Sequence, residues 1–443
     1  MTSGKGRERR VVITGMGWIT PLGHDVDAVW SRLVAGDCGV GRVTKFDAST
    51  FASNFAAEVR DFDFAKLFPD ATRHKDAGDS TKYALAAAYS AWKQAGLDAW
   101  EDFDPTRMGL YMGSGEGPVD LTAFAYSGIA GWDTATRTLN DAKWAAAMTS
   151  RMSCIVELEQ EPNMTVAHVA DAFGLHGPAY NCMTACAAST QAIGEAYEII
   201  KRGDADLMFA GGSHSMIHPL GMTGFIRLTA MSQRRDAMLK AARPFDQTRD
   251  GFVMGEGAGV LVLEEYDQAI ARGATPLAEV AGFGSSADAF RITDIQPDGK
   301  GAVAAMAQAC REAGVSPNEV GSDGRPQVHY ISAHGTGTQE NDRIETRAVK
   351  TLFGELAPKV PFSSVKSMLG HLIQAAGAVE LMTCVQAIKT GILPPTMNLV
   401  TPDPQCDLDY VPNQARDVGR VDVCLSNSFG FGGQNNTICV KRV

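Results

Sequence analysis

The chain repeats one structural plan in its two halves. The plan occurs first in residues 92–117, WKQAGLDAWEDFDPTRMGLYMGSGEG, and again in residues 310–337, CREAGVSPNEVGSDGRPQVHYISAHGTG. Each segment predicts a helix that closes on Ala-Gly, a polar connection, and a strand that ends in a glycine motif. Because the same order of elements returns, we expect a duplicated architecture in which two related halves pack together.

The units that follow are also related, but they differ in length. After Gly115 and after Gly337 the sequence predicts a small-residue loop that opens a helix, which closes on Lys-x-Gly. The connection from Gly115 to Gly203 spans 88 residues and that from Gly337 to Gly391 spans 54, so the first half carries 34 more. We place the extra residues within 118–165, because added length in one copy is typical of a cap or an interface.

Short apolar runs between these units predict buried strands. Examples are Leu207–Ala210 and Gly259–Leu263, which are short and rich in aliphatic residues. Strands that alternate with helices along the chain indicate the α/β class, with helices covering the faces of the sheet. The seam is expected near 265–275, which divides the chain into 9–268, with the extended cap, and 269–443.

Composition and charge exclude several classes of function. The chain has 443 residues, 45% hydrophobic and 21% charged, and its net charge of -11 argues against general nucleic-acid binding. Nine cysteines scattered singly fit neither a disulfide framework nor a zinc site, and no apolar run is long enough to span a membrane. Glycine and proline interrupt the apolar N-terminal segment, so we do not interpret it as a secretory signal. We expect a cytoplasmic protein without a bound metal.

One cysteine, Cys186, stands where a helix is expected to begin. It lies in residues 181–200, NCMTACAASTQAIGEAYEII, where apolar residues recur at helical spacing after the cysteine. The unpaired N–H groups and the positive dipole end of a helix N-terminus favour the thiolate, so we expect a lowered pKa for this thiol. The alternative is a structural cysteine, because free cysteine is among the most buried residue types.

Two histidines are candidates for partners of this cysteine. His334 follows the apolar run VHYISA and His371 opens HLIQAAGAVE, so each lies at a strand-to-helix junction, where ligand-facing residues collect in α/β proteins. A single histidine at such a junction is more often a satisfied hydrogen-bonding residue than a catalyst. A thiol and two imidazoles without a matching carboxylate suit acyl chemistry on a thioester, in which the thiolate attacks and the imidazoles polarise a carbonyl.

Five motifs in order give the chain a resemblance to a known family. They are TACAAS around Cys186, PFDQTRDGFVMGEGAGVLVLEE at 244–265, AHGTGT at 333–338, KSMLGHLIQAAGAVE at 366–380 and NSFGFGGQN at 427–435. Together they resemble the β-ketoacyl-ACP synthases of the elongating, second type, over almost the whole chain. The resemblance implies a duplicated thiolase-like fold of five αβαβα layers, a homodimer, and decarboxylative Claisen condensation of an acyl group with malonyl-ACP.

The resemblance also implies roles for the catalytic residues. Cys186 would take the acyl chain, with its own N–H and that of Phe431 forming the oxyanion hole. His334 and His371 would bind the malonyl thioester carbonyl and stabilise the enolate left when carbon dioxide departs. The phosphopantetheine arm arrives on the acyl carrier protein, so no cofactor of the chain's own is expected.

Further positions match supporting residues of the family. Lys366 and Glu345 match a supporting ion pair, although an ordinary salt bridge would look the same. Asp342 matches the acid of a motif that follows AHGTGT. Thr336 and Thr338 match threonines that hydrogen-bond the phosphopantetheine arm, and they could equally be turn residues.

Aromatic residues are expected near the entrance to the site. Phe431, on the glycine-rich segment GFGGQNN, matches a gating phenylalanine. Phe225 matches a second aromatic near the entrance, and Phe429 is assigned to substrate binding with it. Each of them could simply belong to the core.

Three departures from the family pattern bear on the substrate. The QENDRIET after AHGTGT resembles type II polyketide ketosynthases, and Gln434 stands where the family usually has threonine. Glu116 stands where relatives usually carry an apolar residue or glycine, at the neck of the acyl pocket. If its carboxylate lines that neck, the primer should be short, polar or unsaturated; if it turns away, it pairs with an arginine.

An acyl carrier protein, with its malonyl and acyl thioesters, is the expected partner. Five basic residues within 17 positions could dock its acidic helix, although a solvated face is about as compatible with the pattern: Arg227, Arg234, Arg235, Lys240 and Arg243. A related chain could replace one copy of the expected homodimer. A specialised type II polyketide ketosynthase therefore remains an alternative, as does a chain-length subunit of a heterodimer, although such subunits lose the nucleophile.

Other classes fit the sequence less well. A Rossmann oxidoreductase would need a third glycine after VVITGMGWITPLG, and HSMIH at 214–218 lacks the glutamate of a zinc motif. A degradative thiolase would need a second catalytic cysteine inside the C-terminal glycine loop, whereas Cys424 and Cys439 flank that loop.

Overall fold

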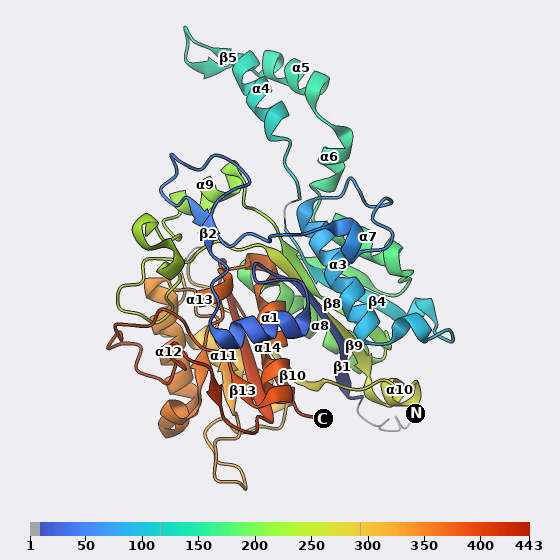
Figure 1. The fold of residues 1–443 in the computed structure, drawn as a ribbon, viewed down its shortest axis with the longest axis vertical. Helices are drawn as coiled ribbons and strands as arrows, with labels where there is room; N and C mark the ends of the chain where they lie inside the picture. Colours follow the sequence, from blue (N-terminus) through green and yellow to red (C-terminus); the bar gives the residue numbers. More distant parts are fainter. Residues whose placement is uncertain (1–8, 116, 293) are drawn as a thin grey trace.

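The structure, a computed structural model, describes residues 9–115, 117–292 and 294–443 (Figure 1). Its main sheet has ten strands in the order β12-β11-β15-β16-β10-β1-β9-β8-β4-β7. Their bounds are β1 Val11–Ile19, β4 Met108–Gly113, β7 Ala179–Cys182, β8 Leu207–His214, β9 Gly257–Glu265, β10 Ala278–Ala287, β11 Tyr330–Ser332, β12 Phe362–Ser363, β15 Val423–Gly430 and β16 Gln434–Lys441.

The strand order repeats itself on either side of the centre, where β1 pairs with β10 in antiparallel fashion. Moving outward, β1 is followed by antiparallel β9 and β8 and then by parallel β4 and β7. From β10 the sheet continues in the same way, through antiparallel β16 and β15 to parallel β11 and β12. The duplication predicted from the repeated plan is therefore confirmed by the topology.

Two helices lie between the halves of the sheet. They are α8 (Ala188–Arg202) and α14 (Ala376–Thr390), and each contacts strands of both halves and the other helix. A Cβ added at Gly377 would meet Oγ1 of Thr190 at 1.9 Å, so the two helices approach more closely than any larger residue would allow. Both helices are buried on most sides because they form the middle layer.

Other helices cover the outer faces. Helices α3 (Asp79–Gln94) and α7 (Met164–Phe173) cover the first half, and α11 (Lys300–Glu312) and α12 (Gln339–Phe353) cover the second (Figure 1). The predicted five-layered αβαβα thiolase-like fold is confirmed. The expected domain boundary at 268 falls within α10 (Tyr266–Ala271), the helix that joins β9 to β10.

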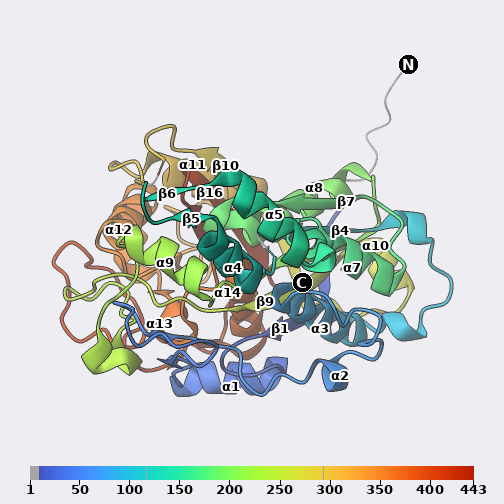
Figure 2. The ribbon, with the colours of Figure 1, turned by 90° about the horizontal axis from the view of Figure 1, so that it is seen from above.

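A helical arm projects from the body (Figure 1). It comprises α4 (Leu121–Gly131), β5 (Trp132–Asp133), β6 (Thr138–Leu139), α5 (Asp141–Arg151) and α6 (Cys154–Glu159), and thus falls within the interval 118–165. Seen from above, α4 and α5 lie side by side, joined by the β5–β6 hairpin (Figure 2). Large apolar side chains of the arm are exposed: Phe124, Tyr126, Ile129, Trp132, Leu139, Met152, Ile155 and Leu158.

Short elements complete the fold. The helices are α1 Val26–Ala35, α2 Phe64–Leu67, α9 Pro219–Arg227 and α13 Lys366–Leu369, and the strands are β2 Gly41–Arg42, β3 Phe55–Ala56, β13 Ile392–Leu393 and β14 Arg416–Asp417. The 3-10 turns are η1 Leu97–Ala99, η2 Pro105–Arg107, η3 Ala185–Ala187, η4 Arg235–Lys240, η5 Gly354–Lys359 and η6 Ile373–Ala375. Among the described residues, no helix is long and apolar enough to cross a membrane.

Candidate active site

Cys186 lies in a tight turn between a strand and a helix. The turn is η3, which follows β7 and leads directly into α8. Ala185 has a φ of 48°, an unfavourable left-handed conformation that the surrounding packing must hold in place. In the second half, η6 leads into α14 in the same way, Ile373 has a φ of 42°, and Gln374 occupies the place of the cysteine.

Burial raises the pKa of the Cys186 thiol to about 12. Lys366 and the backbone N–H groups of Phe431 and of Cys186 itself act in the opposite direction, but they do not outweigh desolvation. The lowered pKa expected from the helix start is therefore wrong, because that expectation left out the loss of water around a side chain that is only 5% exposed.

His371 contacts the thiol directly. Its Nε2 lies 3.0 Å from Sγ of Cys186, and its Nδ1 accepts a hydrogen bond from the N–H of Ile373 at 3.2 Å. Because Nδ1 uses its lone pair in that bond, the proton of the neutral ring belongs on Nε2, which faces Sγ. Burial, with help from Lys366 and His334, holds the pKa of His371 well below its usual value, so the ring is neutral at pH 7.

His334 completes the group. Its ring centroid lies 5.6 Å from that of His371, and a ring nitrogen of each histidine and Sγ of Cys186 all lie within 4.8 Å of one another. Burial and the nearby Lys366 lower the pKa of His334 well below its usual value. The site therefore presents two neutral imidazoles, which can donate N–H groups to a carbonyl oxygen beside the thiol.

Buried charged groups hold the backbone of His334 from two sides. Its N–H donates to Oε1 of Glu345 at 2.8 Å, and its carbonyl accepts from Nζ of Lys366 at 2.6 Å. The other carboxylate oxygen of Glu345 accepts from the N–H of Gly335, also at 2.8 Å. Lys366 and Glu345 thus position the histidine through its main chain.

Lys366 forms its ion pair with Glu380 and not with Glu345, which corrects the pairing expected from the resemblance. Glu345 instead meets the two backbone N–H groups and Nδ2 of Asn427, at 3.2 Å. Burial raises the pKa of both Glu345 and Glu380 to about 7. Sequence reasoning missed Glu380 and Asn427, although one closes the motif KSMLGHLIQAAGAVE and the other opens NSFGFGGQN.

A cavity of about 470 Å³, here called the channel, leads from the surface to these three residues. Four of the other predicted residues line it: Thr336, Thr338, Phe429 and Phe431. The hydroxyls of Thr336 and Thr338 lie 3.0 Å apart, and Phe431 is 36% exposed. Phe225 is not among the lining residues; it packs edge-on against Phe252, with centroids 5.6 Å apart, in the apolar cluster around Cys186.

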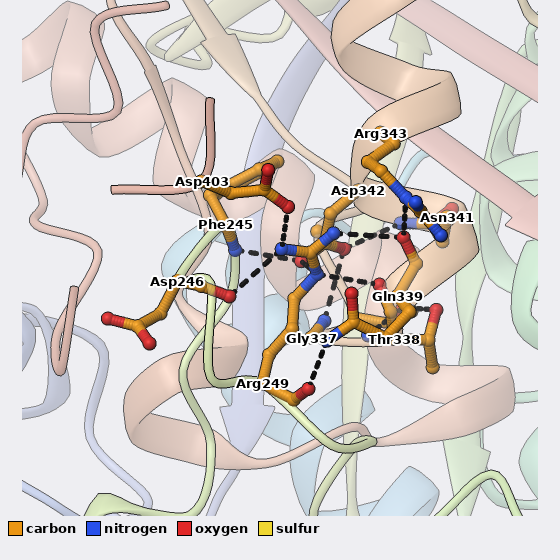
Figure 3. Close-up of polar contacts among 12 residues, drawn as sticks. Phe245, Asp246, Arg249, Gly337, Thr338, Gln339, Asn341, Asp342, Arg343 and Asp403 are labelled. Carbon is orange, nitrogen blue, oxygen red and sulfur yellow. Dashed lines mark hydrogen bonds and ion pairs between the residues drawn. The ribbon is translucent and has the colours of Figure 1, made fainter. Parts of the chain in front are cut away.

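A buried arginine fixes the loop that carries the two threonines (Figure 3). The guanidinium of Arg249 forms two ion pairs, at 2.7 Å with Oδ2 of Asp403 and at 3.4 Å with Oδ2 of Asp342. It also donates hydrogen bonds to three backbone carbonyls, those of Asp246, Thr338 and Gln339. Asp342 in turn accepts from the N–H groups of Phe245 and Gly337. The supporting role expected for Asp342 thus has a visible geometry, whereas Arg249 was not singled out from the sequence.

Two further expectations have different outcomes. Glu116 lies outside the described residues, so its expected place at the neck of the acyl pocket stays a prediction.

The five basic residues of the expected docking surface do not all face outward. Arg234 lies 3.8 Å from Asp250, which lines the channel, and Arg235 donates to the carbonyl of Ser49. Arg243 is 9% exposed and donates to the carbonyl of Lys240, so it faces inward and cannot belong to a docking surface.

A duplicated αβαβα fold with a buried thiol and two neutral imidazoles at the end of a channel defines a thiolase-type condensing enzyme. Comparison with known proteins narrows this class. Residues 8–269 match the family model "Beta-ketoacyl synthase, N-terminal domain", and residues 277–400 match "Beta-ketoacyl synthase, C-terminal domain". The chain belongs to the β-ketoacyl synthase family.

Individual relatives extend over the whole chain. A 3-oxoacyl-[acyl-carrier-protein] synthase 2 of Coxiella burnetii is 41% identical over 98% of this chain and 99% of its own. A solved type II PKS acyl-carrier protein in complex with its ketosynthase bound to the hexaketide is similar with a TM-score of 0.83 and 31% identity, covering 99% of this chain and all of that one. The ishigamide ketosynthase/chain length factor gives a TM-score of 0.84 and 32% identity, over 98% and 100%.

Proposed function

We propose that this chain is a β-ketoacyl-ACP synthase, which joins an acyl group held on Cys186 to the two-carbon unit of malonyl-ACP with loss of carbon dioxide. The observation that carries the proposal is the placement of the thiol and the two neutral imidazoles within 4.8 Å of one another at the end of the channel. Its relatives named 3-oxoacyl-[acyl-carrier-protein] synthase support the same reaction.

The first half-reaction moves the acyl group to the enzyme. Sγ of Cys186 attacks the thioester carbonyl, the new C–S bond forms, and the pantetheine thiol leaves with the proton that the cysteine gives up. The N–H groups of Cys186 and Phe431, which point to Sγ, stabilise the negative oxygen of the tetrahedral intermediate. Because the pKa of the free thiol is about 12, attack depends on proton removal as the C–S bond forms.

The second half-reaction uses the histidines. The Nε2–H of His371 and the ring N–H of His334 donate to the malonyl thioester carbonyl, which accumulates charge as the bond to the carboxylate breaks. Carbon dioxide leaves, and its bonding electrons form the enolate. The enolate carbon then attacks the acyl carbonyl, a C–C bond forms, the C–S bond breaks, and Cys186 is released as thiolate and takes up a proton.

The carrier protein brings the phosphopantetheine arm, which we place in the channel beside Thr336 and Thr338, with Phe431 at the gate. No cofactor held by the chain itself enters this scheme. All nine cysteines lie in the described part of the chain and all are free thiols, which supports a reducing, cytoplasmic location.

A second copy of the chain is the proposed partner of the arm. The exposed apolar side chains of α4, α5 and α6 form a surface that a monomer would leave in water. The outermost strand β7 also leaves an edge free for pairing and exposes Tyr180. A related chain could occupy the same surface, as in a ketosynthase/chain length factor pair.

A type II polyketide ketosynthase is the second candidate. It is favoured by the Asn341-Asp342 pair after the threonine loop and by the similarity to solved ketosynthases of that kind. A non-catalytic chain-length subunit is less compatible, because Cys186 is present.

The test is whether the purified chain alone becomes acylated and condenses. Intact-protein mass spectrometry after incubation with acyl-ACP should show one acyl adduct that is absent from Cys186→Ala, and labelled malonyl-ACP should then yield 3-oxoacyl-ACP and carbon dioxide. No adduct and no carbon dioxide would refute the proposed activity, whereas activity that needs a second related chain would establish the heterodimer.

A further inference from the structure

A second cavity, of about 480 Å³, opens at the same edge of the sheet as the nucleophile. It is lined by Gly115 and Gly117, which follow β4, and by Ser215 and Ile217, which follow β8. Strands β8, β4 and β7 are parallel neighbours, and Cys186 follows β7. The thiol and the second cavity therefore share the carboxyl ends of one set of parallel strands, where ligands collect in α/β folds.

An apolar wall separates the second cavity from the channel. Cys186 packs in one cluster with Ile217, Met222 and Ile373, and Phe46 packs against it. Cys186 lines the channel, whereas Ile217 and Phe46 line the second cavity. In the proposed reaction the pantetheine arm fills the channel, so we route an acyl chain on Sγ through this cluster, and the second cavity lies on its other side.

Acidic side chains outnumber basic side chains in the lining of the second cavity. Among the described lining residues, four carboxylates face a single lysine: Asp76, Asp79, Glu159 and Glu161 against Lys45. Nζ of Lys45 is already bound to Asp79 at 3.0 Å and to the buried Glu256 at 2.7 Å. Within the described chain, no cation forms a salt bridge with Asp76 or Glu161. The excess of negative charge disfavours an anionic or purely apolar occupant.

One of these carboxylates is buried and only half satisfied. Glu159 is 6% exposed, and its Oε1 lies 2.9 Å from Nε2 of His168, whose Nδ1 lies 2.8 Å from Nδ1 of His74. The histidine pair thus fixes Oε1, while Oε2 is buried without a hydrogen-bond partner among the described residues. A buried acceptor without a donor is unfavourable, so a ligand that supplies a donor would relieve it.

Hydroxyl groups extend the polar lining toward α3 and α7. Oγ1 of Thr81 and Oγ1 of Thr165 lie 2.9 Å apart, and Oγ of Ser80 donates to Ser213 at 2.9 Å. Thr81, Thr165 and Ser80 all line the second cavity. A saturated hydrocarbon chain placed there would displace water from hydroxyls and carboxylates without replacing its hydrogen bonds.

We propose that the second cavity receives the far end of the acyl group carried by Cys186 and selects chains that end in a hydrogen-bond donor, an ammonium or a hydroxyl group, over saturated chains. This inference rests on the proposed condensing function. A cavity of about 480 Å³ lies within the range of about 300–1,000 Å³ that is typical of small-molecule sites, so it has room for an acyl group of about ten heavy atoms.

The test compares three N-acetylcysteamine thioesters of equal length on the full chain at pH 7: nonanoyl, 8-hydroxyoctanoyl and 8-aminooctanoyl. The rate at which each acylates Cys186 is followed by intact-protein mass spectrometry. We expect at least one donor-bearing chain to load ten-fold faster or more than nonanoyl. If the amine loads faster than the alcohol, the positive charge of the ammonium group is the main basis of selection. If the alcohol loads faster than the amine, hydrogen bonding is the main basis.

Glu159→Gln should reduce the preference for the amine over nonanoyl at least five-fold, because it removes the negative charge at nearly constant volume. The matched control is Glu157→Gln, an exposed position two residues earlier on α6 that does not line the second cavity, and it should keep the wild-type preference. If nonanoyl loads as fast as both polar chains, the inference is wrong and the condensing function stands. If no thioester acylates Cys186 and acyl-ACP also fails, the proposed function itself is wrong.

Discussion

Replacing Arg249 by methionine removes the only guanidinium among the described residues that bridges Asp342 and Asp403 (Figure 3). In the pair with Asp342 both side chains are fully buried. Methionine fills much of the same volume, but it leaves two carboxylates without their cation and the carbonyl of Thr338 without its guanidinium donor. The carbonyls of Asp246 and Gln339 each lose one donor and keep another, the backbone N–H of residue 249 and Nε of Arg343.

The magnitude follows from these losses. Removing one partner of a buried ion pair costs about 3–5 kcal/mol, because the remaining charge stays buried and unpaired. The loss of the guanidinium donor to the carbonyl of Thr338 adds about 1–3 kcal/mol. We therefore expect Arg249→Met to lower the free energy of unfolding by about 4 kcal/mol or more, and Arg249→Lys, which keeps the charge but has three donors in place of five, to lower it by less.

The assay is equilibrium urea unfolding followed by tryptophan fluorescence. Arg202→Met is the matched control, because its ion pair with Asp204 is more than half exposed on both sides, and we expect a change within about 0.5 kcal/mol. Because Arg249 also binds the carbonyl of Thr338, the folded fraction of Arg249→Met should show a raised KM for malonyl-ACP. A loss of stability below about 1 kcal/mol would refute the assignment of Arg249 as the anchor of this loop.

Three further predictions concern the site. Cys186→Ala should abolish condensation but retain malonyl decarboxylation, whereas His334→Ala and His371→Ala should permit acylation and block release of labelled carbon dioxide; condensation by Cys186→Ala would contradict the scheme. The pKa of Glu345 is raised to about 7, so its contribution to stability is fully present below about pH 4.5 and is lost as the pH rises through 7. Relative to wild type, Glu345→Gln should therefore become progressively more stable between pH 5 and pH 8 in urea titrations, and a constant difference would show that Glu345 does not titrate there. Arg234→Glu with Arg235→Glu should raise KM for the carrier-bound substrate and weaken its dependence on salt, because exposed charges are screened within about 8 Å at physiological ionic strength; unchanged kinetics would exclude these arginines from docking.

Sequence predicted the fold and the reacting group because both depend on order and spacing. The repeated plan gave the duplicated sheet, and the motifs around Cys186, His334 and His371 gave three side chains that the structure brings together. Lys366 was assigned the wrong partner, because a motif says which residues are near but not which carboxylate the backbone N–H groups already occupy. The pKa of Cys186 was misjudged because burial is a tertiary property.

The second cavity could not be predicted, because no local pattern connects its walls. Lys45, Asp79, Glu159 and Ser215 come from four separate segments, each of which resembles an ordinary loop or helix surface in the sequence. Only the close approach of α3, α7 and the ends of β4 and β8 turns them into one polar surface. The contacts of Arg249 could not be predicted for the same reason, because its partners Thr338 and Asp403 lie 89 and 154 residues further along the chain.

The turn at η6 shows how the active site is divided between the two halves of the chain. It repeats the strained geometry of η3 at the other end of the internal symmetry, yet it carries Gln374, whose Oε1 is bonded to Nδ1 of His214. One copy of this turn thus carries the nucleophile and the other is a structural joint, while the loop just before η6 carries His371. Neither half holds both the attacking atom and its imidazoles, so the reaction depends on the contact between the halves, and a single half cut from this protein would be inert.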